Sequence, residues 1–227
     1  MSVELKLRTP SIKELAEIVG GKTECFGNID TDSRITSVTT SSGEAVGGTL
    51  FCAIKGTRVD GADFIPDAVS RGAVCVMTVT VPDAVKNCGN FAAIVVDDVI
   101  LALGRFAEWY RNQSKATFVA ITGSVGKTTT KEFIASVAGA RFVTHKTQGN
   151  YNNELGLPLT LLGLSAEDEV SVIELGMSDP GEIEYMSKIV KPDIAIVTNI
   201  GTSHLATLGT RENICKAKLE IATTPAP

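Results

Sequence analysis

The segment 122–130 places a glycine turn and a lysine between an apolar run and a helix-like stretch. It reads Thr-Gly-Ser-Val-Gly-Lys-Thr-Thr-Thr, with Ala-Thr-Phe-Val-Ala-Ile before it and Lys-Glu-Phe-Ile-Ala after it. A strand, a glycine turn, and a lysine and a hydroxyl that open a helix form the arrangement by which proteins surround phosphate groups. The segment therefore predicts a phosphate-binding loop between a strand and a helix.

The residue types in this loop suit the phosphates of a nucleoside triphosphate. Glycines permit a sharp turn that aims backbone N–H groups at phosphate oxygens, because no Cβ stands in the way. Lys127 would supply a cation for the β- and γ-phosphates, and the Thr128 hydroxyl would reach Mg²⁺. The predicted nucleotide-binding residues are Thr122, Gly123, Ser124, Val125, Gly126, Lys127, Thr128 and Thr129.

The loop is a variant form of the common motif. That motif has another glycine five residues before the Gly-Lys pair, and this chain has Ile121 there. The alternative interpretation is an ordinary glycine turn with a solvated lysine. The strand before it and the helix after it favour the phosphate loop.

Composition excludes several classes of protein. With 227 residues and 44% apolar residues, the chain can form one large or two small domains with buried cores. A net charge of -5 without a block of Lys and Arg argues against a nucleic-acid partner. No apolar leader opens the chain and no apolar stretch approaches the roughly 18 residues that span a bilayer, so we expect a cytoplasmic protein without membrane insertion. The five cysteines never form a C-x-x-C pair, and we expect reduced thiols.

Two domains follow from the order of the predicted elements. Ser11 with Glu14 predicts a capped helix that ends at Gly20-Gly21. We expect strands near 35–40, 49–54, 73–79 and 91–96 and helices near 62–70 and 99–111, a small mixed α/β domain over residues 1–113. From 114 to 227 strands and helices alternate, and the apolar runs 170–175 and 193–199 predict a mostly parallel sheet covered on both faces.

Polar residues follow two of these apolar strands. Glu174 ends the run 170–173, where a Mg²⁺ ligand is expected beside a phosphate loop, although a helix cap or a lysine partner would explain it equally well. His204 follows the next strand. A lone histidine at such a position is more often a hydrogen-bonded structural residue than a ligand.

Four segments in order resemble the Mur ligases, and residues 48–64 are similar to the uridine-nucleotide-binding region of that family. The resemblance covers essentially the whole chain, and it is closest to the members that add D-alanyl-D-alanine during peptidoglycan synthesis. The four segments are Thr-Gly-Ser-Val-Gly-Lys-Thr at 122–128, Gly-Asn-Tyr-Asn-Asn-Glu-Leu-Gly-Leu-Pro at 149–158, Glu-Leu-Gly-Met-Ser-Asp-Pro-Gly-Glu-Ile at 174–183, and Thr-Asn-Ile-Gly-Thr-Ser-His-Leu at 198–205.

The resemblance implies a P-loop ATPase domain with ATP and Mg²⁺ as cofactors. Thr128, Glu174 and His204 would hold the metal. Lys218 corresponds to a lysine that Mur ligases carry as a carbamate, which turns a cation into an anion. The alternative is a solvated helix lysine. Lys216 is only two residues away, so the family's lysine could also be matched to that position. The catalytic residues would be Lys127, Glu174, His204 and Lys218, and Asn152 and Asn153 would lie near the nucleotide or simply shape their loop.

The resemblance also implies the substrates. ATP would phosphorylate a carboxylate of UDP-MurNAc-tripeptide, and the amine of D-alanyl-D-alanine would attack the acyl phosphate. The expected substrate-binding residues are Thr39, Thr40, Lys55, Gly56, Thr57 and Arg58. Ser41-Ser42-Gly43 stands where the family often has Asp-Ser/Thr-Arg, which removes an acid and a guanidinium from the expected sugar-nucleotide site.

Mur ligases continue beyond the length of this chain with the rest of the ATPase domain and a third domain. We therefore expect a truncated, monomeric chain that lacks full activity. Two other interpretations remain open: a different ligase of the superfamily, of the MurE type or like folylpolyglutamate synthase, and a P-loop ATP-binding module without ligase activity.

Overall fold

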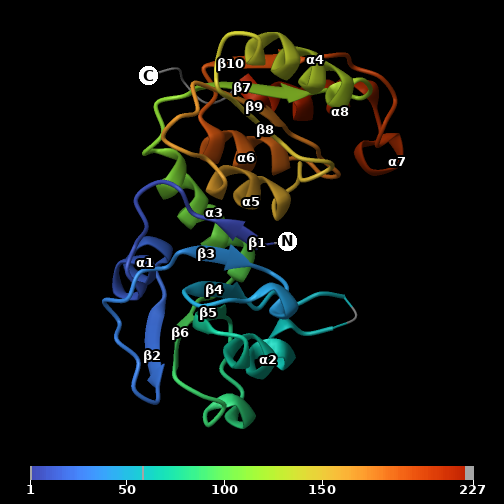
Figure 1. Cartoon of the computed structure of the whole chain (residues 1–227). Helices are drawn as coiled ribbons and strands as arrows, with labels where there is room; N and C mark the ends of the chain where they lie inside the picture. The colour runs from blue at the N-terminus through green and yellow to red at the C-terminus, as the bar shows by residue number, and fades with distance from the viewer. Residues whose placement is uncertain (1, 58, 223–227) are drawn as a thin grey trace. The chain divides into compact units, whose positions relative to one another are not determined.

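The chain divides into two units at the end of helix α3 (Val99–Arg111). The first unit is Met1–Tyr110 and the second is Arg111–Pro227 (Figure 1). The computed structural model describes residues 2–57 and 59–222. Both units contain a mostly parallel sheet with helices around it, so the predicted α/β class is confirmed.

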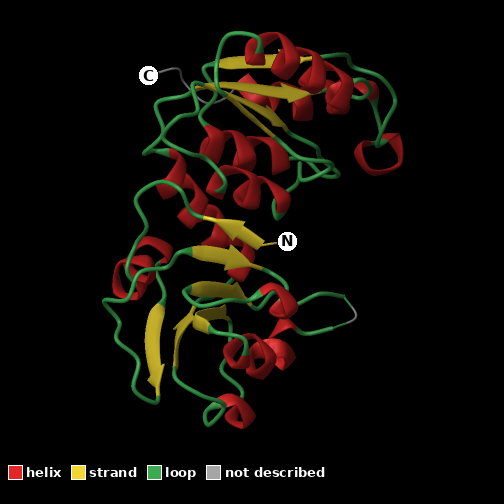
Figure 2. Ribbon diagram, in the orientation of Figure 1, coloured by secondary structure: helices red, strands yellow, loops and turns green. Residues whose placement is uncertain are grey.

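The sheet of the first unit has a parallel centre and antiparallel edges (Figure 2). Its strand order is β1-β3-β4-β5-β6-β2, and only the pairs β1·β3 and β2·β6 are antiparallel. The sequence analysis missed both edge strands, because β1 is short and β2 is largely exposed and polar. The strands are β1 (Ser2–Glu4), β2 (Lys22–Phe26), β3 (Ser37–Thr39), β4 (Thr49–Cys52), β5 (Ala73–Thr78) and β6 (Phe91–Val95).

The helices of the first unit begin and end where the sequence predicts. Helix α1 (Ile12–Val19) is capped by the Ser11 side chain, which accepts the N–H of Glu14 at 3.2 Å, and it ends at Gly20 with φ +71°. The helix expected at 62–70 is a 3₁₀ turn, η2 (Gly61–Phe64), that continues as α2 (Ile65–Ser70). Two further 3₁₀ turns are η1 (Ser42–Glu44) and η3 (Asp83–Val85).

The sheet of the second unit is entirely parallel, in the order β10-β7-β9-β8. Helix α4 lies over one face of this sheet, and α5 and α6 lie over the other (Figure 1). The strands are β7 (Thr117–Thr122), β8 (Thr144–Lys146), β9 (Val170–Glu174) and β10 (Ile194–Val197). The helices are α4 (Lys127–Gly139), α5 (Gly156–Leu162), α6 (Glu182–Val190), α7 (Leu205–Leu208) and α8 (Arg211–Leu219), followed by η4 (Glu220–Ala222).

The register of this sheet brings three loops together. Strand β7 lies between β9 and β10, with Ile121 opposite Glu174 and Thr122 opposite Val197. Since parallel strands end at the same edge, the segments that follow β7, β9 and β10 leave the sheet side by side. The edge where they meet is where ligands of such sheets bind.

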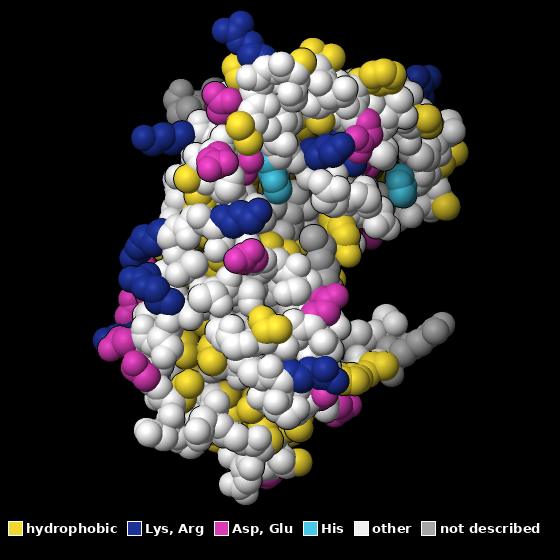
Figure 3. All heavy atoms as spheres, viewed as in Figure 1, with side chains coloured by type: hydrophobic (Ala, Val, Ile, Leu, Met, Phe, Trp, Pro, Cys, Tyr) yellow, Lys and Arg dark blue, Asp and Glu magenta, His cyan; other side chains and the backbone are white. Residues whose placement is uncertain are grey.

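The surface charges, the cysteines and the hydropathy of the helices add three observations. Acidic and basic side chains are interspersed over the face in Figure 3. The five cysteines are free, and burial raises the pKa of the Cys52 thiol to about 12. Among residues 2–57 and 59–222, no helix has the length and apolarity needed to cross a bilayer.

Tyr110 ties the start of the chain to α3, which gives a first prediction. Its buried hydroxyl oxygen accepts the N–H groups of Lys6 and Leu7, each at 2.6 Å. Tyr110→Phe leaves both donors without that acceptor, so we expect the free energy of unfolding to fall by about 1–3 kcal/mol. Urea titration followed by the fluorescence of Trp109, the single tryptophan, measures this in the first unit. Tyr151→Phe in the second unit is the control, and an unchanged midpoint for Tyr110→Phe would contradict the prediction.

Candidate nucleotide-binding site

The glycines of the loop after β7 are required by its geometry. Gly123 has φ +149°, and a Cβ there would lie 1.9 Å from the Thr198 hydroxyl oxygen. Gly126 has φ +85° and begins helix α4. Any other residue at 123 would push the loop away from the segment after β10, so glycine permits the close approach of the two loops.

Four hydrogen bonds hold the loop against the segment after β10. Asn199 accepts the N–H of Ser124 on its carbonyl at 3.1 Å and the N–H of Val125 on its side chain at 3.0 Å. Thr198 donates its hydroxyl to the Val125 carbonyl at 2.7 Å, and the Ser124 hydroxyl accepts the N–H of Gly201 at 2.9 Å. The N–H groups of Ser124 and Val125 are therefore already bonded, which leaves the start of α4 as the stronger place for an anion.

The N-terminus of α4 fits a phosphate group. The first N–H groups of a helix have no partner within the helix, and the N-cap Gly126 has no side chain to accept them. Thr128 and Thr129 in this turn are exposed. The Lys127 ammonium donates to the Gly123 carbonyl at 2.9 Å, which holds a positive charge over the loop. Free donors, the helix dipole and this charge all favour a negative ligand.

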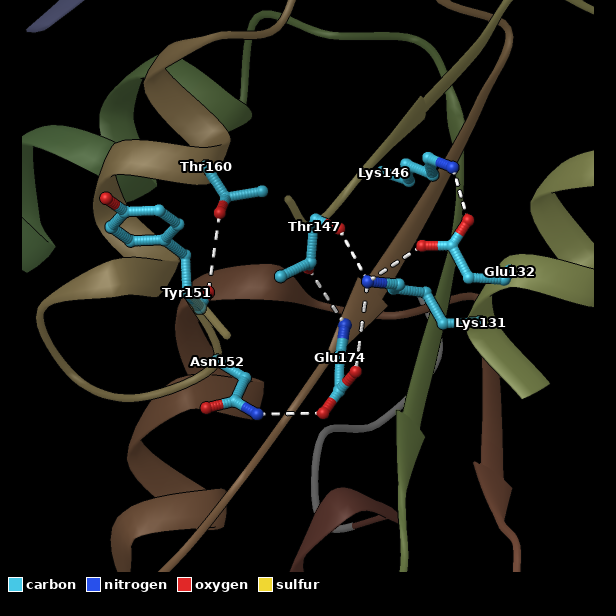
Figure 4. Close-up of polar contacts among 8 residues, drawn as sticks. All are labelled: Lys131, Glu132, Lys146, Thr147, Tyr151, Asn152, Thr160 and Glu174. Atoms are coloured by element: carbon cyan, nitrogen blue, oxygen red, sulfur yellow. Dashed lines mark hydrogen bonds and ion pairs between the residues drawn. The ribbon is translucent and has the colours of Figure 1, made fainter. Parts of the chain in front are cut away.

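Within the described chain, Glu174 offers one oxygen without a hydrogen-bond partner at the same edge of the sheet. Its side chain is only 2% exposed. Its Oε1 accepts from the Asn152 side chain at 2.8 Å, and its backbone N–H donates to the Thr147 hydroxyl at 3.0 Å (Figure 4). Among the described residues its Oε2 is buried without a hydrogen-bond partner. A carboxylate oxygen in this state fits a hard cation such as Mg²⁺.

The two asparagines of the segment 149–158 have structural partners. Besides its bond to Glu174, Asn152 accepts the N–H of Gly176 on its carbonyl at 2.7 Å. Asn153 is exposed, and its side chain accepts the N–H of Gly156 at 2.8 Å at the start of α5. These contacts favour the interpretation that both residues shape the loop and orient the acid. Contact with a nucleotide remains a prediction for them.

The sequence analysis missed Lys131, which is 1% exposed. Its ammonium donates to the Thr147 carbonyl at 2.8 Å and lies 3.2 Å from Glu132 Oε1 and 4.0 Å from Glu174 Oε2 (Figure 4). Hydrogen bonds from Lys146 and Lys131, in that order, lower the pKa of Glu132. A lysine in a predicted helix is normally expected to be solvent-exposed. Its position four residues after Lys127, on the same helix face, was the signal that could have found it.

His204 and Lys218 lie in different surroundings. His204 is exposed and begins α7 with φ +63°. Lys218 lies in α8 and is 1% exposed, so the alternative of a solvated lysine is wrong. Burial, and secondarily the charge of Lys127, lowers the pKa of Lys218 to about 8. Within the described part of the chain no three His, Cys, Asp or Glu side chains gather as a metal site.

The predicted substrate-binding residues follow two adjacent parallel strands of the first unit, β3 and β4. Thr39 is buried, and its hydroxyl accepts the N–H of Ser41 at 3.1 Å. This hydroxyl therefore stabilises the turn after β3. Glu44 Oε2 lies 3.2 Å from the same hydroxyl and supplies an acid that the sequence analysis missed. Thr40 is half-buried, Lys55, Gly56 and Thr57 are exposed, and Arg58 lies outside the described residues.

Comparison with known protein families matches most of the chain. The Mur ligase family, catalytic domain, matches residues 34–111, and the Mur ligase middle domain matches residues 121–226. The chain belongs to the Mur ligase family. The recognition made from the four sequence segments is thereby confirmed.

Similar members of the Mur ligase family include MurF enzymes. The UDP-N-acetylmuramoyl-tripeptide--D-alanyl-D-alanine ligase of Bacillus subtilis (strain 168) is 40% identical over 93% of this chain and 45% of its own length. MurF from Acinetobacter baumannii superposes with a TM-score of 0.87 at 36% identity, over 99% of this chain and 48% of that protein. MurF ligase from Thermotoga maritima, whose crystal structure is a complex with ADP, superposes with a TM-score of 0.74 at 36% identity, over 81% of this chain and 42% of that protein. The chain thus spans about half the length of these relatives.

The lowered pKa of Lys218 predicts a pH dependence of stability. Its folded pKa of about 8 lies below its ordinary value of 10.5, so between these values the unfolded chain binds more protons and stability rises with pH. As pH falls toward 8 this gain in stability is lost, because the folded chain also binds the proton below its pKa of about 8. Between pH 7.5 and 9.5 we expect the parent chain to gain roughly 1–2 kcal/mol relative to Lys218→Met. Denaturant titrations in CO₂-free buffer measure the difference, and parallel pH profiles of the two chains would contradict it.

Proposed function

We propose that this chain is the sugar-nucleotide-binding and ATP-binding part of a ligase that joins D-alanyl-D-alanine to UDP-MurNAc-tripeptide. One observation carries the proposal: the start of α4, which has no side-chain cap and carries Lys127, lies at the same sheet edge as the Glu174 oxygen that has no hydrogen-bond partner in the described chain. The names of the MurF relatives support the substrates, and the ADP complex of the Thermotoga maritima MurF supports the nucleotide.

In the proposed reaction the γ-phosphoryl group passes from ATP to a substrate carboxylate, and ADP leaves. The amine then attacks the acyl carbon, phosphate departs, and an amide bond forms. Lys127 and the N–H groups at the start of α4 would stabilise the negative charge on the transferring phosphoryl. Thr128, Glu174 and His204 would hold Mg²⁺, which neutralises phosphate charge when bound. The protein supplies position and charge, and no covalent enzyme nucleophile is needed.

Lys218 suits the proposed carbamylation. The reaction needs a neutral amine, which attacks CO₂ and releases a proton, and the lowered pKa of Lys218 provides that form near neutral pH. The neighbouring Lys127 charge that disfavours the ammonium would favour the carbamate anion. If this is right, added bicarbonate stabilises the parent chain against denaturant and leaves Lys218→Met unchanged.

Nucleotide binding provides the first test. The Lys127 ammonium lies over the loop, so Lys127→Ala should weaken ATP binding by the 227-residue chain roughly tenfold or more. Isothermal titration with ATP and Mg²⁺ measures the affinity. Lys188→Ala is the matched control, because Lys188 is an exposed lysine that pairs with Glu184 on α6. Equal affinities for the parent chain and Lys127→Ala would count against the loop as the phosphate site.

The acceptor provides the second test and separates the related ligases. Titrating the chain with UDP-MurNAc-tripeptide, UDP-MurNAc-L-alanyl-D-glutamate and tetrahydrofolate should show tightest binding of the tripeptide compound. Preference for the dipeptide compound would favour a MurE-type ligase, and preference for the folate a folylpolyglutamate synthase. A chain that binds ATP and none of the three would favour an ATP-binding module without ligase activity.

A further inference from the structure

The proposed reaction assigns no role to the buried ammonium group of Lys131. Lys131 is fully buried and lies one helical turn beyond Lys127 in α4. Its ammonium is 4.0 Å from Glu174 Oε2, which has no hydrogen-bond partner among the described residues (Figure 4). That separation is too long for a hydrogen bond, so the interaction is one of charge alone. Oε2 therefore keeps its lone pairs, while a fixed cation stands beside it.

Thr147 sets the spacing between these two charges. Its carbonyl accepts from Lys131 at 2.8 Å, and its hydroxyl accepts the backbone N–H of Glu174 at 3.0 Å. A single buried residue after β8 thus holds both groups. On the other side Glu132 Oε1 lies 3.2 Å from the Lys131 ammonium, while Glu132 Oε2 binds Lys146. The ammonium is held in place from two directions and does not need Glu174 to fix it.

The charges in this network cancel before any ligand binds. Lys131 balances Glu174 in the interior, and Lys146 balances Glu132 nearer the surface. A divalent cation on Glu174 would add two positive charges a few ångströms from a buried ammonium. The repulsion is weakly screened there. Phosphate groups that arrive with the metal would cancel that excess.

We propose that Lys131 is a positioning residue that makes metal binding at Glu174 depend on the nucleotide. By repelling a free divalent cation it leaves the site to the metal–nucleotide pair. This inference rests on the proposed function and deepens it, because it assigns a role to a lysine outside the phosphate loop. Lys131 touches neither the phosphates nor the metal in this role and acts through the field at Glu174.

Manganese binding tests the inference without relying on activity. Free Mn²⁺ is followed by electron paramagnetic resonance during titration of the chain, first alone and then with saturating ADP. Lys131→Met removes the charge and keeps the length of the side chain, so the affinity for Mn²⁺ alone should rise roughly three- to tenfold. With ADP present the affinity should stay level or fall. The dependence of metal binding on nucleotide should therefore shrink.

Three further variants separate charge from structure. Lys131→Arg keeps the charge and should behave like the parent chain. Lys146→Met removes a charge from the same network at its exposed end and should also leave Mn²⁺ affinity unchanged. Glu132→Gln removes the competing partner of Lys131, so the affinity for Mn²⁺ alone should fall. Glu132 is about half exposed, which keeps this variant folded if Lys131→Met is not.

The results distinguish this inference from the proposed function. A parent chain that binds no Mn²⁺ with or without ADP contradicts the proposed site, and the inference with it. A parent chain that binds Mn²⁺, together with Lys131→Met of equal or weaker affinity for the metal alone, overturns only the inference. If Lys131→Met is unfolded by circular dichroism, an unchanged or increased affinity in Glu132→Gln overturns it instead.

Discussion

The register of three parallel strands is the constraint on which the candidate site depends. With Ile121 opposite Glu174 and Thr122 opposite Val197, the phosphate loop, the acid and the segment after β10 must leave the sheet together. A slip of one residue in β9 would turn Glu174 to the other face of the sheet, since side chains alternate. The site is thus fixed by backbone pairing before any polar contact forms.

Sequence reasoning found the parts of the site that have a local pattern. The glycines and Lys127 of the loop, and Glu174 at the end of a buried strand, follow from spacing and hydrophobic runs. Helix α1, with its Ser11 cap and Gly20 end, followed from the same kind of local signal. Edge strands such as β2 were missed because their exposed polar residues lack the alternation that a half-buried strand shows.

The contacts that tune the site could not be read from the chain. Lys131, Thr147 and Asn152 come from three separate segments, and only the fold brings them to Glu174. The four-residue spacing from Lys127 puts Lys131 on the same helix face, but only the fold shows that its side chain is buried. Likewise the motif around Asn152 predicts a position near the nucleotide or a role in shaping the loop, and the structure adds the hydrogen bond from its amide to Glu174.

The balance of charge around the loop argues for what the site accepts. Glu174 is matched by Lys131 at 4.0 Å, which leaves the Lys127 charge in excess within this group of residues. Burial first, and the Lys127 charge second, lowers the pKa of Lys218, so this excess acts on a neighbouring group. A metal alone would increase the excess, and a polyphosphate alone would still leave Glu174 Oε2 unused. A polyphosphate with a divalent cation satisfies both, which is why the loop and the acid are best understood as one site.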